Sequence, residues 1–292
     1  MILPEFDYVS FNSIEDTVGF LARYGEESKV VAGGTDLMIK LGTGEVKVKY
    51  IVNILDMANL GQIKVNEHRV SIGPTVTHTE LACSPIINKF APVLSQGAAA
   101  IGSPQIRNQG TIGGNIGNAS PAADTVPALM VLNSRLKIIS QRGERWIPLA
   151  DFFLSPHQTV LARDELIGEI EVEKLPQDTP FSFQRVSRRR AMDIAQMSVA
   201  VILFMDDNGE RILEARIAPG SVSPTPVRIQ EAERILKGQR ASDRVIELAA
   251  AEVSNRAIDE SDLQWLPEYK KPALKGLVIR AIKDAVEKRG WI

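Results

Sequence analysis

VAGGTDL at residues 31–37 and TIGGN at residues 111–115 are the two stretches on which the interpretation of this sequence depends. Each places a Gly-Gly pair, Gly33-Gly34 or Gly113-Gly114, next to an apolar segment. Glycine adopts positive φ and lets a backbone approach a ligand closely. Backbone N–H groups that converge in this way bind phosphate oxygens. We therefore expect the N–H groups of both segments to face one diphosphate from two sides.

The glycine pairs do not decide between a phosphate site and ordinary turns, because a single Gly-Gly pair is usually a turn. Two familiar nucleotide motifs are missing from the sequence. There is no G-x-x-x-x-G-K-[ST], which disfavours a P-loop nucleotidase, and no G-x-G-x-x-G that opens a helix, which disfavours a Rossmann dinucleotide fold. If the chain binds a dinucleotide, it does so without either of these two motifs.

Composition narrows the class of protein. The chain has 292 residues, of which 44% are hydrophobic and 24% charged, enough for a substantial core and a length that suggests two domains. A net charge of -2 argues against nucleic acid as the main partner. A lone cysteine, Cys83, excludes an internal disulfide framework and cannot hold an iron–sulfur cluster or a structural zinc ion. With no basic leader and no apolar run of roughly 20 residues, we expect a cytoplasmic protein without membrane insertion.

The predicted elements mix strands and helices without regular alternation. β-branched runs predict strands at 29–32, 50–54, 69–73, 135–139, 197–205 and 214–218. Amphipathic or capped patterns predict helices at 12–24, from 77, and at 230–236, 242–257 and 272–287. The segment from Gly102 to Asp124, rich in glycine and proline, is expected to be mostly loop, and 174–180 resembles a linker. This arrangement favours an α+β fold over a doubly wound parallel sheet.

Longer segments around the glycine pairs carry a resemblance to a known family. They are KVVAGGTDL (29–37), IGSPQIRNQGTIGGNIGNASPAADTVPAL (101–129) and RRRAMDIA (188–195). Over about residues 3 to 285 the chain resembles the FAD-binding medium subunits of the molybdenum hydroxylases, such as xanthine, carbon monoxide and nicotinate dehydrogenases. The resemblance implies an α+β FAD-binding domain of the PCMH or vanillyl-alcohol-oxidase type at residues 1–175, with subdomains of about 1–57 and 58–175. A smaller C-terminal α+β domain would follow at 180–290.

The resemblance also implies which residues contact FAD. The first segment would wrap the diphosphate and ribose with Lys29, Val30, Val31, Ala32, Gly33, Gly34, Thr35, Asp36 and Leu37. The second would hold the other side with Thr111, Gly113, Gly114 and Asn115, with Asn118 and Asp124 close to the diphosphate and ribose. Contacts along the flavin and adenine would come from Ile101, Ile106, Gly110, Ile167, Arg185 and Ile194.

Some positions differ from the family pattern or fall outside the implied site. Arg185 stands where relatives often carry a lysine, and Ile194 where some place an aromatic residue over the flavin. The segment Leu154–Thr159 replaces a loop that is commonly Gly-x-x-Lys-Thr. His78 is expected to cap a helix or remain solvated, and His157 to lie in a loop. No residue is expected to be catalytic, and no metal site is expected on this chain.

By the same resemblance, the chain would be an electron-transfer subunit. It would pass electrons from [2Fe–2S] clusters of a small partner subunit through FAD to NAD⁺ or another acceptor, most closely like a xanthine dehydrogenase. A large molybdopterin subunit would oxidise the organic substrate, in a dimer of heterotrimers. Two alternatives stay open: a self-contained flavin oxidase or dehydrogenase of the same fold, and the FAD subunit of a reductive relative such as hydroxybenzoyl-CoA reductase. A third, a cofactor-free assembly scaffold with this fold, is disfavoured by the intact glycines of both segments.

Overall fold

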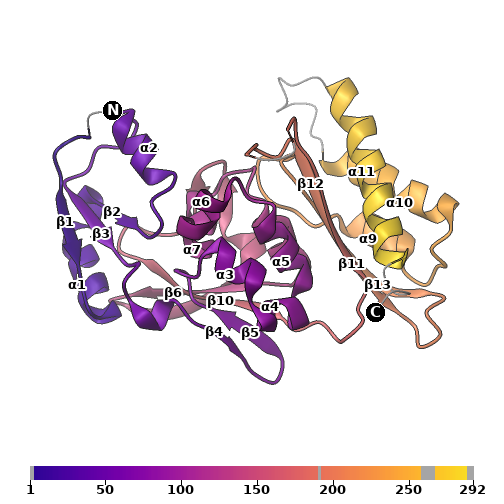
Figure 1. The fold of residues 1–292 in the computed structure, drawn as a ribbon, viewed down its shortest axis with the longest axis horizontal. Helices are drawn as coiled ribbons and strands as arrows, with labels where there is room; N and C mark the ends of the chain where they lie inside the picture. Colours follow the sequence, from indigo (N-terminus) through magenta and orange to yellow (C-terminus); the bar gives the residue numbers. More distant parts are fainter. Residues whose placement is uncertain (1–2, 190–191, 258–266, 288–292) are drawn as a thin grey trace.

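The protein is described by a computed structural model in which residues 3–189, 192–257 and 267–287 are placed (Figure 1). Arg190 and Ala191, part of the RRRAMDIA segment, therefore lie outside the described residues. Along the longest axis of Figure 1 the chain forms a small N-terminal lobe, a central sheet with its helices, and a C-terminal sheet packed against helices.

The N-terminal lobe is a three-stranded parallel sheet in the order β1 (Asp7–Ser10), β3 (Tyr50–Asn53) and β2 (Ser28–Val31). Helix α1 (Ile14–Tyr24) begins at Ser13, whose side chain accepts a hydrogen bond from the backbone N–H of Asp16, and packs Val18 and Leu21 against Val52. Helix α2 (Leu37–Gly42) packs Leu41 with Val31 and Ile51. The 3₁₀ turn η1 (Gly25–Glu27) precedes β2, and η2 (Ala58–Leu60) leads from this lobe into the next sheet.

The central lobe is an antiparallel sheet of five strands covered by short helices on one face (Figure 1). Its strand order is β4 (Ile63–Val65), β5 (Arg69–Ile72), β10 (Leu166–Glu173), β6 (Arg135–Ser140) and β7 (Gly143–Pro148). The covering helices are α3 (His78–Cys83), α4 (Pro85–Phe90), α5 (Pro92–Ala99), α6 (Pro104–Gln109), α7 (Ile112–Asn118) and α8 (Thr125–Val131). A turn η3 (Leu149–Asp151) leads to the small hairpin β8 (Phe153–Ser155) and β9 (Gln158–Thr159).

The expectation of a loop from Gly102 to Asp124 is wrong, because α6 and α7 occupy most of it. Two side-chain caps explain the difference. Ser103 accepts a hydrogen bond from the N–H of Ile106, and Thr111 accepts one from the N–H of Gly114. Packing of Ile112 and Ile116 into the central core then stabilises a helix that its glycines disfavour.

The C-terminal lobe is an antiparallel sheet, β11 (Phe181–Val186), β12 (Met197–Met205) and β13 (Ile212–Gly220). Alternate residues of β12 point to opposite faces. Val199 and Val201 pack with α9 (Gln230–Leu236), α10 (Asp243–Ala257) and α11 (Pro267–Glu287), whereas Ala200 and Ile202 join the core of the central lobe. The mixture of sheets and helices confirms the predicted α+β class.

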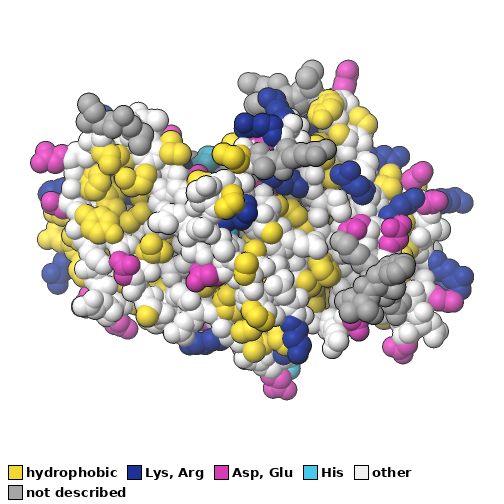
Figure 2. Space-filling model, in the orientation of Figure 1, with side chains coloured by type: hydrophobic (Ala, Val, Ile, Leu, Met, Phe, Trp, Pro, Cys, Tyr) yellow, Lys and Arg dark blue, Asp and Glu magenta, His cyan; other side chains and the backbone are white. Residues whose placement is uncertain are grey.

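Charged side chains of both signs lie on the surface around the C-terminal helices. Figure 2 shows acidic and basic side chains interspersed over the face that carries α10 and α11, with no single-sign patch on that face. None of the helices in the described ranges combines the length and apolar character needed to cross a bilayer.

Candidate functional site

A cavity of about 700 Å³ lies between the N-terminal lobe and the helices of the central lobe. Figure 2 shows the surface indented along this boundary. Both glycine segments line the cavity: residues 29–37 form one wall, and Gly110, Thr111 and α7 form the other. A volume of this size falls in the range of small-molecule and cofactor sites, about 300–1,000 Å³.

The first wall is built at the end of β2, where the chain leaves the sheet and turns into α2. Gly34 makes this turn with φ of +69°, in the left-handed region that favours glycine. Among the described residues, no acceptor is bonded to the backbone N–H groups of Gly33, Gly34 or Thr35. Three neighbouring donors therefore stand free beside the cavity, as an anion-binding turn requires.

Gly33 also sets the distance between the two walls. A Cβ at this position would lie 1.9 Å from the carbonyl oxygen of Gln109 and 3.0 Å from the Cα of Gly110. No side chain fits there, so the glycine lets the first turn pack directly on the backbone that precedes Thr111. The two glycine segments, far apart in sequence, are thus brought into contact at the cavity.

The second wall differs from the expectation that its backbone N–H groups face a ligand. The N–H of Gly113 donates to the carbonyl of Pro74 at 2.8 Å, and the N–H of Gly114 donates to Oγ1 of Thr111 at 3.1 Å. These donors are already used within the chain. Gly113 is needed for packing, since a Cβ there would lie 2.5 Å from Cβ of Pro74.

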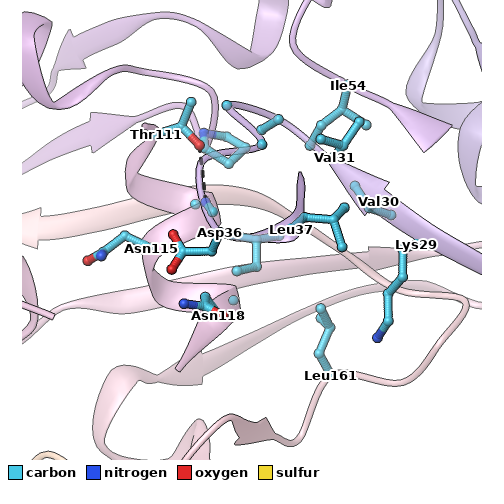
Figure 3. A pocket seen from close by; sticks show the side chains of 18 of the residues that line it. Lys29, Val30, Val31, Asp36, Leu37, Ile54, Thr111, Asn115, Asn118 and Leu161 are labelled. Atoms are coloured by element: carbon cyan, nitrogen blue, oxygen red, sulfur yellow. Dashed lines mark hydrogen bonds between the residues drawn. The ribbon is translucent and has the colours of Figure 1, made fainter. Parts of the chain in front are cut away.

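Polar side chains on α7 replace those backbone donors. Figure 3 shows Asn115 and Asn118 on the same side of the cavity as Asp36, with Val31, Ile54 and Leu161 toward the other side. Asn115 accepts a hydrogen bond from Thr125 through Oδ1 at 2.6 Å, which leaves its amide NH₂ as a donor. The second wall therefore offers side-chain donors to an anionic ligand.

Apolar residues line the cavity on both sides of this polar middle. Ile101 and Ile106 lie just before and within α6, whereas Val30 lies in β2 and Leu161 and Ile167 lie just before and at the start of β10. A polar centre between two apolar regions suits a ligand with a charged middle and a planar group at each end.

His78 lies in the cavity wall, contrary to the expectation that it caps a helix or stays solvated. It is 2% exposed, and Nδ1 has no hydrogen-bond partner among the described residues. Burial, reinforced by the charge of Arg107, lowers the pKa of His78 to about 4. The actual cap of α3 is Thr77, which forms a capping box with Glu80. His78 therefore stays neutral at pH 7.

Three predicted contact residues, Asp124, Arg185 and Ile194, are not among the residues that line the cavity. Ile194 is 74% exposed on the segment after β11. Asp124 and Arg185 form a separate buried pair, with Nε 3.3 Å from Oδ2 but poorly aligned for a hydrogen bond, since Nε and Oδ1 both lack hydrogen-bond partners. Arg185 instead donates to the carbonyls of Ala100 and Asp193.

The Asp124 carboxyl of this pair has a raised pKa. Burial raises the pKa of Asp124 to about 7, although the charge of Arg185 acts in the opposite direction. Asp124 precedes Thr125, the residue that bonds Asn115 in the cavity wall. The pair thus lies next to the cavity and supports its second wall.

Several lining residues were not predicted as contacts, among them Lys40, His157 and Leu161. Lys40 follows Asp36 by one helical turn, a spacing that could have indicated it. His157 lies in the hairpin β8–β9 with φ of +60° and donates from Nδ1 to the carbonyl of Asn118 at 2.9 Å. Leu161 reaches the cavity only through the tertiary fold, which no local signal reveals.

These features fit FAD. The free N–H groups of the first turn and the amide side chains of α7 suit a diphosphate, and the apolar regions on either side suit the flavin and adenine rings. Gly117 has nothing within 4 Å of its Cβ position, so the cavity-facing surface of α7 leaves room for a ligand.

Comparison with known families agrees with this fit. Residues 4–175 match the model of the FAD binding domain in molybdopterin dehydrogenase, and residues 182–285 match the CO dehydrogenase flavoprotein C-terminal domain. The chain is 32% identical to the 6-hydroxypseudooxynicotine dehydrogenase complex subunit alpha of Paenarthrobacter nicotinovorans, covering 98% of this chain and 96% of the relative. It is 30% identical to the putative xanthine dehydrogenase FAD-binding subunit XdhB of Escherichia coli, covering 98% of each chain.

Solved structures show the same similarity. A chain of the carbon monoxide dehydrogenase from Hydrogenophaga pseudoflava superposes with a TM-score of 0.93 at 28% identity, covering 99% of both chains. The α+β architecture is therefore that of the flavoprotein chains of this family. The chain belongs to the family of FAD-binding subunits of the molybdenum hydroxylases and is an oxidoreductase subunit.

Proposed function

We propose that the cavity between residues 29–37 and α7 holds FAD, and that this chain carries electrons from [2Fe–2S] clusters of a partner subunit to NAD⁺. The observation that carries the proposal is the meeting of the two glycine segments at one cavity, with the N–H groups of Gly33, Gly34 and Thr35 free. A bound flavin supplies both one-electron and hydride chemistry, which suits a link between iron–sulfur clusters and a two-electron acceptor.

The residues of this chain bind and shield the cofactor in the proposal. The first turn and the Asn115 side chain hold the diphosphate by hydrogen bonds. Ile101 and Ile106 exclude water from one ring, and Leu161 and Ile167 cover the other. The proposal assigns no proton transfer to the side chains of the cavity, because the organic substrate is oxidised on another polypeptide.

The partners in this proposal are a small [2Fe–2S] subunit and a large molybdopterin subunit, arranged as a dimer of heterotrimers. Support comes from the relatives, whose names describe subunits of dehydrogenase complexes. We propose a xanthine-like heterocycle as the substrate of the complex, on the strength of the 30% identity to the xanthine dehydrogenase subunit.

We also propose two domains. Residues 1–175 form the FAD-binding domain, with subdomains of about 1–57 and 58–175, and residues 180–290 form the second. The separate sheet β1–β3–β2, the five-stranded sheet and the sheet β11–β12–β13 support these divisions, as do the ranges of the two family matches.

Purification of the complex from its natural host tests the function. An affinity tag on this chain should recover two further polypeptides, with FAD, iron and molybdenum in the eluate and NAD⁺ reduction on addition of xanthine. Recovery of this chain alone, turning over an organic substrate with FAD as its sole cofactor, would contradict the proposal and favour a self-contained flavoenzyme.

A further inference from the structure

Lys40 is a cation placed inside the cavity. It lies in α2 and lines the cavity with its side chain 25% exposed. Its Nζ donates to Oδ1 of Asn118 at 3.1 Å, a residue 78 positions later in the chain. The lysine therefore reaches from the first wall to the second.

The charge of Lys40 is poorly compensated within the protein. Asn118 is a neutral partner, and the one ion pair described for Lys40 is with Glu45 at 3.9 Å. The Glu45 side chain is 65% exposed, so water screens that pair strongly. Most of the positive charge is left to act on whatever occupies the cavity.

Lys40 also lies close to the free N–H donors of the turn that contains Gly33 and Gly34. The N–H of Lys40 donates to the carbonyl of Asp36 at 3.1 Å, so Lys40 stands one turn of helix beyond the glycine turn. Asp36 adds a carboxylate to the same cavity. Neutral N–H donors alone do not balance a diphosphate beside a carboxylate, whereas an ammonium group does so with a charge-assisted hydrogen bond.

We propose that Lys40, held across the cavity by Asn118, is a cationic contact to the diphosphate of the bound dinucleotide. The assignment rests on the proposed function and names a residue for it. Asn118 positions the ammonium group, and His157 in turn fixes Asn118 through the hydrogen bond to its backbone carbonyl.

A purely structural role for Lys40 makes different predictions. If the lysine only ties the two walls together, Lys40→Gln, which keeps a donor without the charge, should behave like wild type or weaken all ligands equally. If the charge binds the diphosphate, Lys40→Gln and Lys40→Met should weaken only ligands that carry phosphate, and Lys40→Arg should restore most of the affinity.

Equilibrium titrations of the full-length, flavin-free chain separate these roles. FAD and riboflavin are followed by flavin fluorescence, and ADP by its displacement of FAD. We expect Lys40→Gln to weaken FAD and ADP by about tenfold with riboflavin unchanged, and to flatten the dependence of FAD affinity on salt. Lys47→Gln is the matched control, because Lys47 is exposed and does not line the cavity.

The outcomes are distinct. If Lys40→Gln binds FAD as wild type does, or loses riboflavin to the same degree as FAD, the assignment of Lys40 is wrong while FAD binding stands. If the folded wild-type chain binds no FAD at all, the proposed function fails. Should Lys40→Met not fold, the glutamine and arginine variants still decide the assignment.

Discussion

Gly33 packs against Gln109 so closely that a Cβ on Gly33 would stand 1.9 Å from the Gln109 carbonyl oxygen. The contact is between backbones, so rotation of a side chain does not relieve it. It joins the turn after β2 to the segment before α7, the two parts of the chain that form the cavity.

Gly33→Ala should therefore push the cavity walls apart. We expect a loss of about 3 kcal/mol in the free energy of unfolding, typical of a severe overpacking, together with loss of retained FAD. Denaturant unfolding and flavin content of the purified variant measure both effects. Gly19→Ala is the control, because Gly19 lies in α1 with nothing within 4 Å of its Cβ position and should gain stability. Full flavin content in Gly33→Ala would refute the role assigned to this contact.

His78 should make stability depend on pH in the acid range. Its pKa is lowered by burial to about 4 in the folded chain, against 6.5 for an ordinary histidine. Between these values the unfolded chain binds the proton and the folded chain does not. The free energy of unfolding should therefore fall by about 3 kcal/mol through this group as pH drops from 6.5 to 4.

Denaturant unfolding across this pH range, compared with His78→Asn, isolates the contribution. In His78→Asn the free energy of unfolding should fall less between pH 6.5 and 4 than in wild type. In His68→Asn it should fall as in wild type, because the His68 side chain is 83% exposed. Identical pH profiles for wild type and His78→Asn would show that His78 is not held neutral.

Asp124 should make the protein less stable as pH rises, the opposite of the pH dependence expected from His78. Its pKa is raised by burial to about 7, above the ordinary 3.8, so the folded chain keeps a proton that the unfolded chain has released. The stability from this group is complete below about 3.8 and is lost as pH rises through 7, by about 4 kcal/mol. Asp124→Asn carries no such proton. The difference in unfolding free energy, wild type minus variant, should fall between pH 4 and 8, and a constant difference would contradict the account.

Arg216 ties the C-terminal sheet to the central lobe and should be costly to remove. It is buried in β13 and donates to Glu173 at 2.9 Å and to the carbonyl of Val131 at 3.2 Å. Arg216→Met removes the ion-pair partner of Glu173, to which Asn133 still donates, and the side-chain donor to the Val131 carbonyl. Because the Glu173 side chain is 34% exposed, we expect a loss of about 2 kcal/mol. Arg234→Met, which breaks an exposed i,i+3 pair with Glu231, should cost under about 0.5 kcal/mol. Equal unfolding midpoints for the two variants would show that the contacts of Arg216 with the central lobe do not stabilise the fold.

The helices and strands that local sequence patterns determine were predicted correctly. The strand Met197–Met205 and the helix Gln230–Leu236 were predicted with the bounds observed, because an unbroken apolar run and an amphipathic repeat are local signals. The segment Gly102–Asp124 was misjudged because its glycines and prolines dominate the local pattern. Its helices depend on the caps Ser103 and Thr111 and on burial against the central sheet, and burial is a tertiary effect.

Only part of the site was predictable from the sequence. The glycine pairs identified the two walls, since close backbone approach demands that residue type. Lys40 was missed although it follows Asp36 by one helical turn, because its contact with Asn118 is made only in the folded chain. His78 was missed because its burial in the cavity wall is a tertiary effect. The division into domains at about residue 175 stays a prediction.

A crystal structure of the full-length chain with bound FAD tests the central claim most directly. The account predicts the diphosphate between residues 33–36 and α7, with its oxygens about 3 Å from the backbone nitrogens of Gly33, Gly34 or Thr35. Density for FAD elsewhere on the chain, or in the cavity with the diphosphate directed away from this turn, would contradict it.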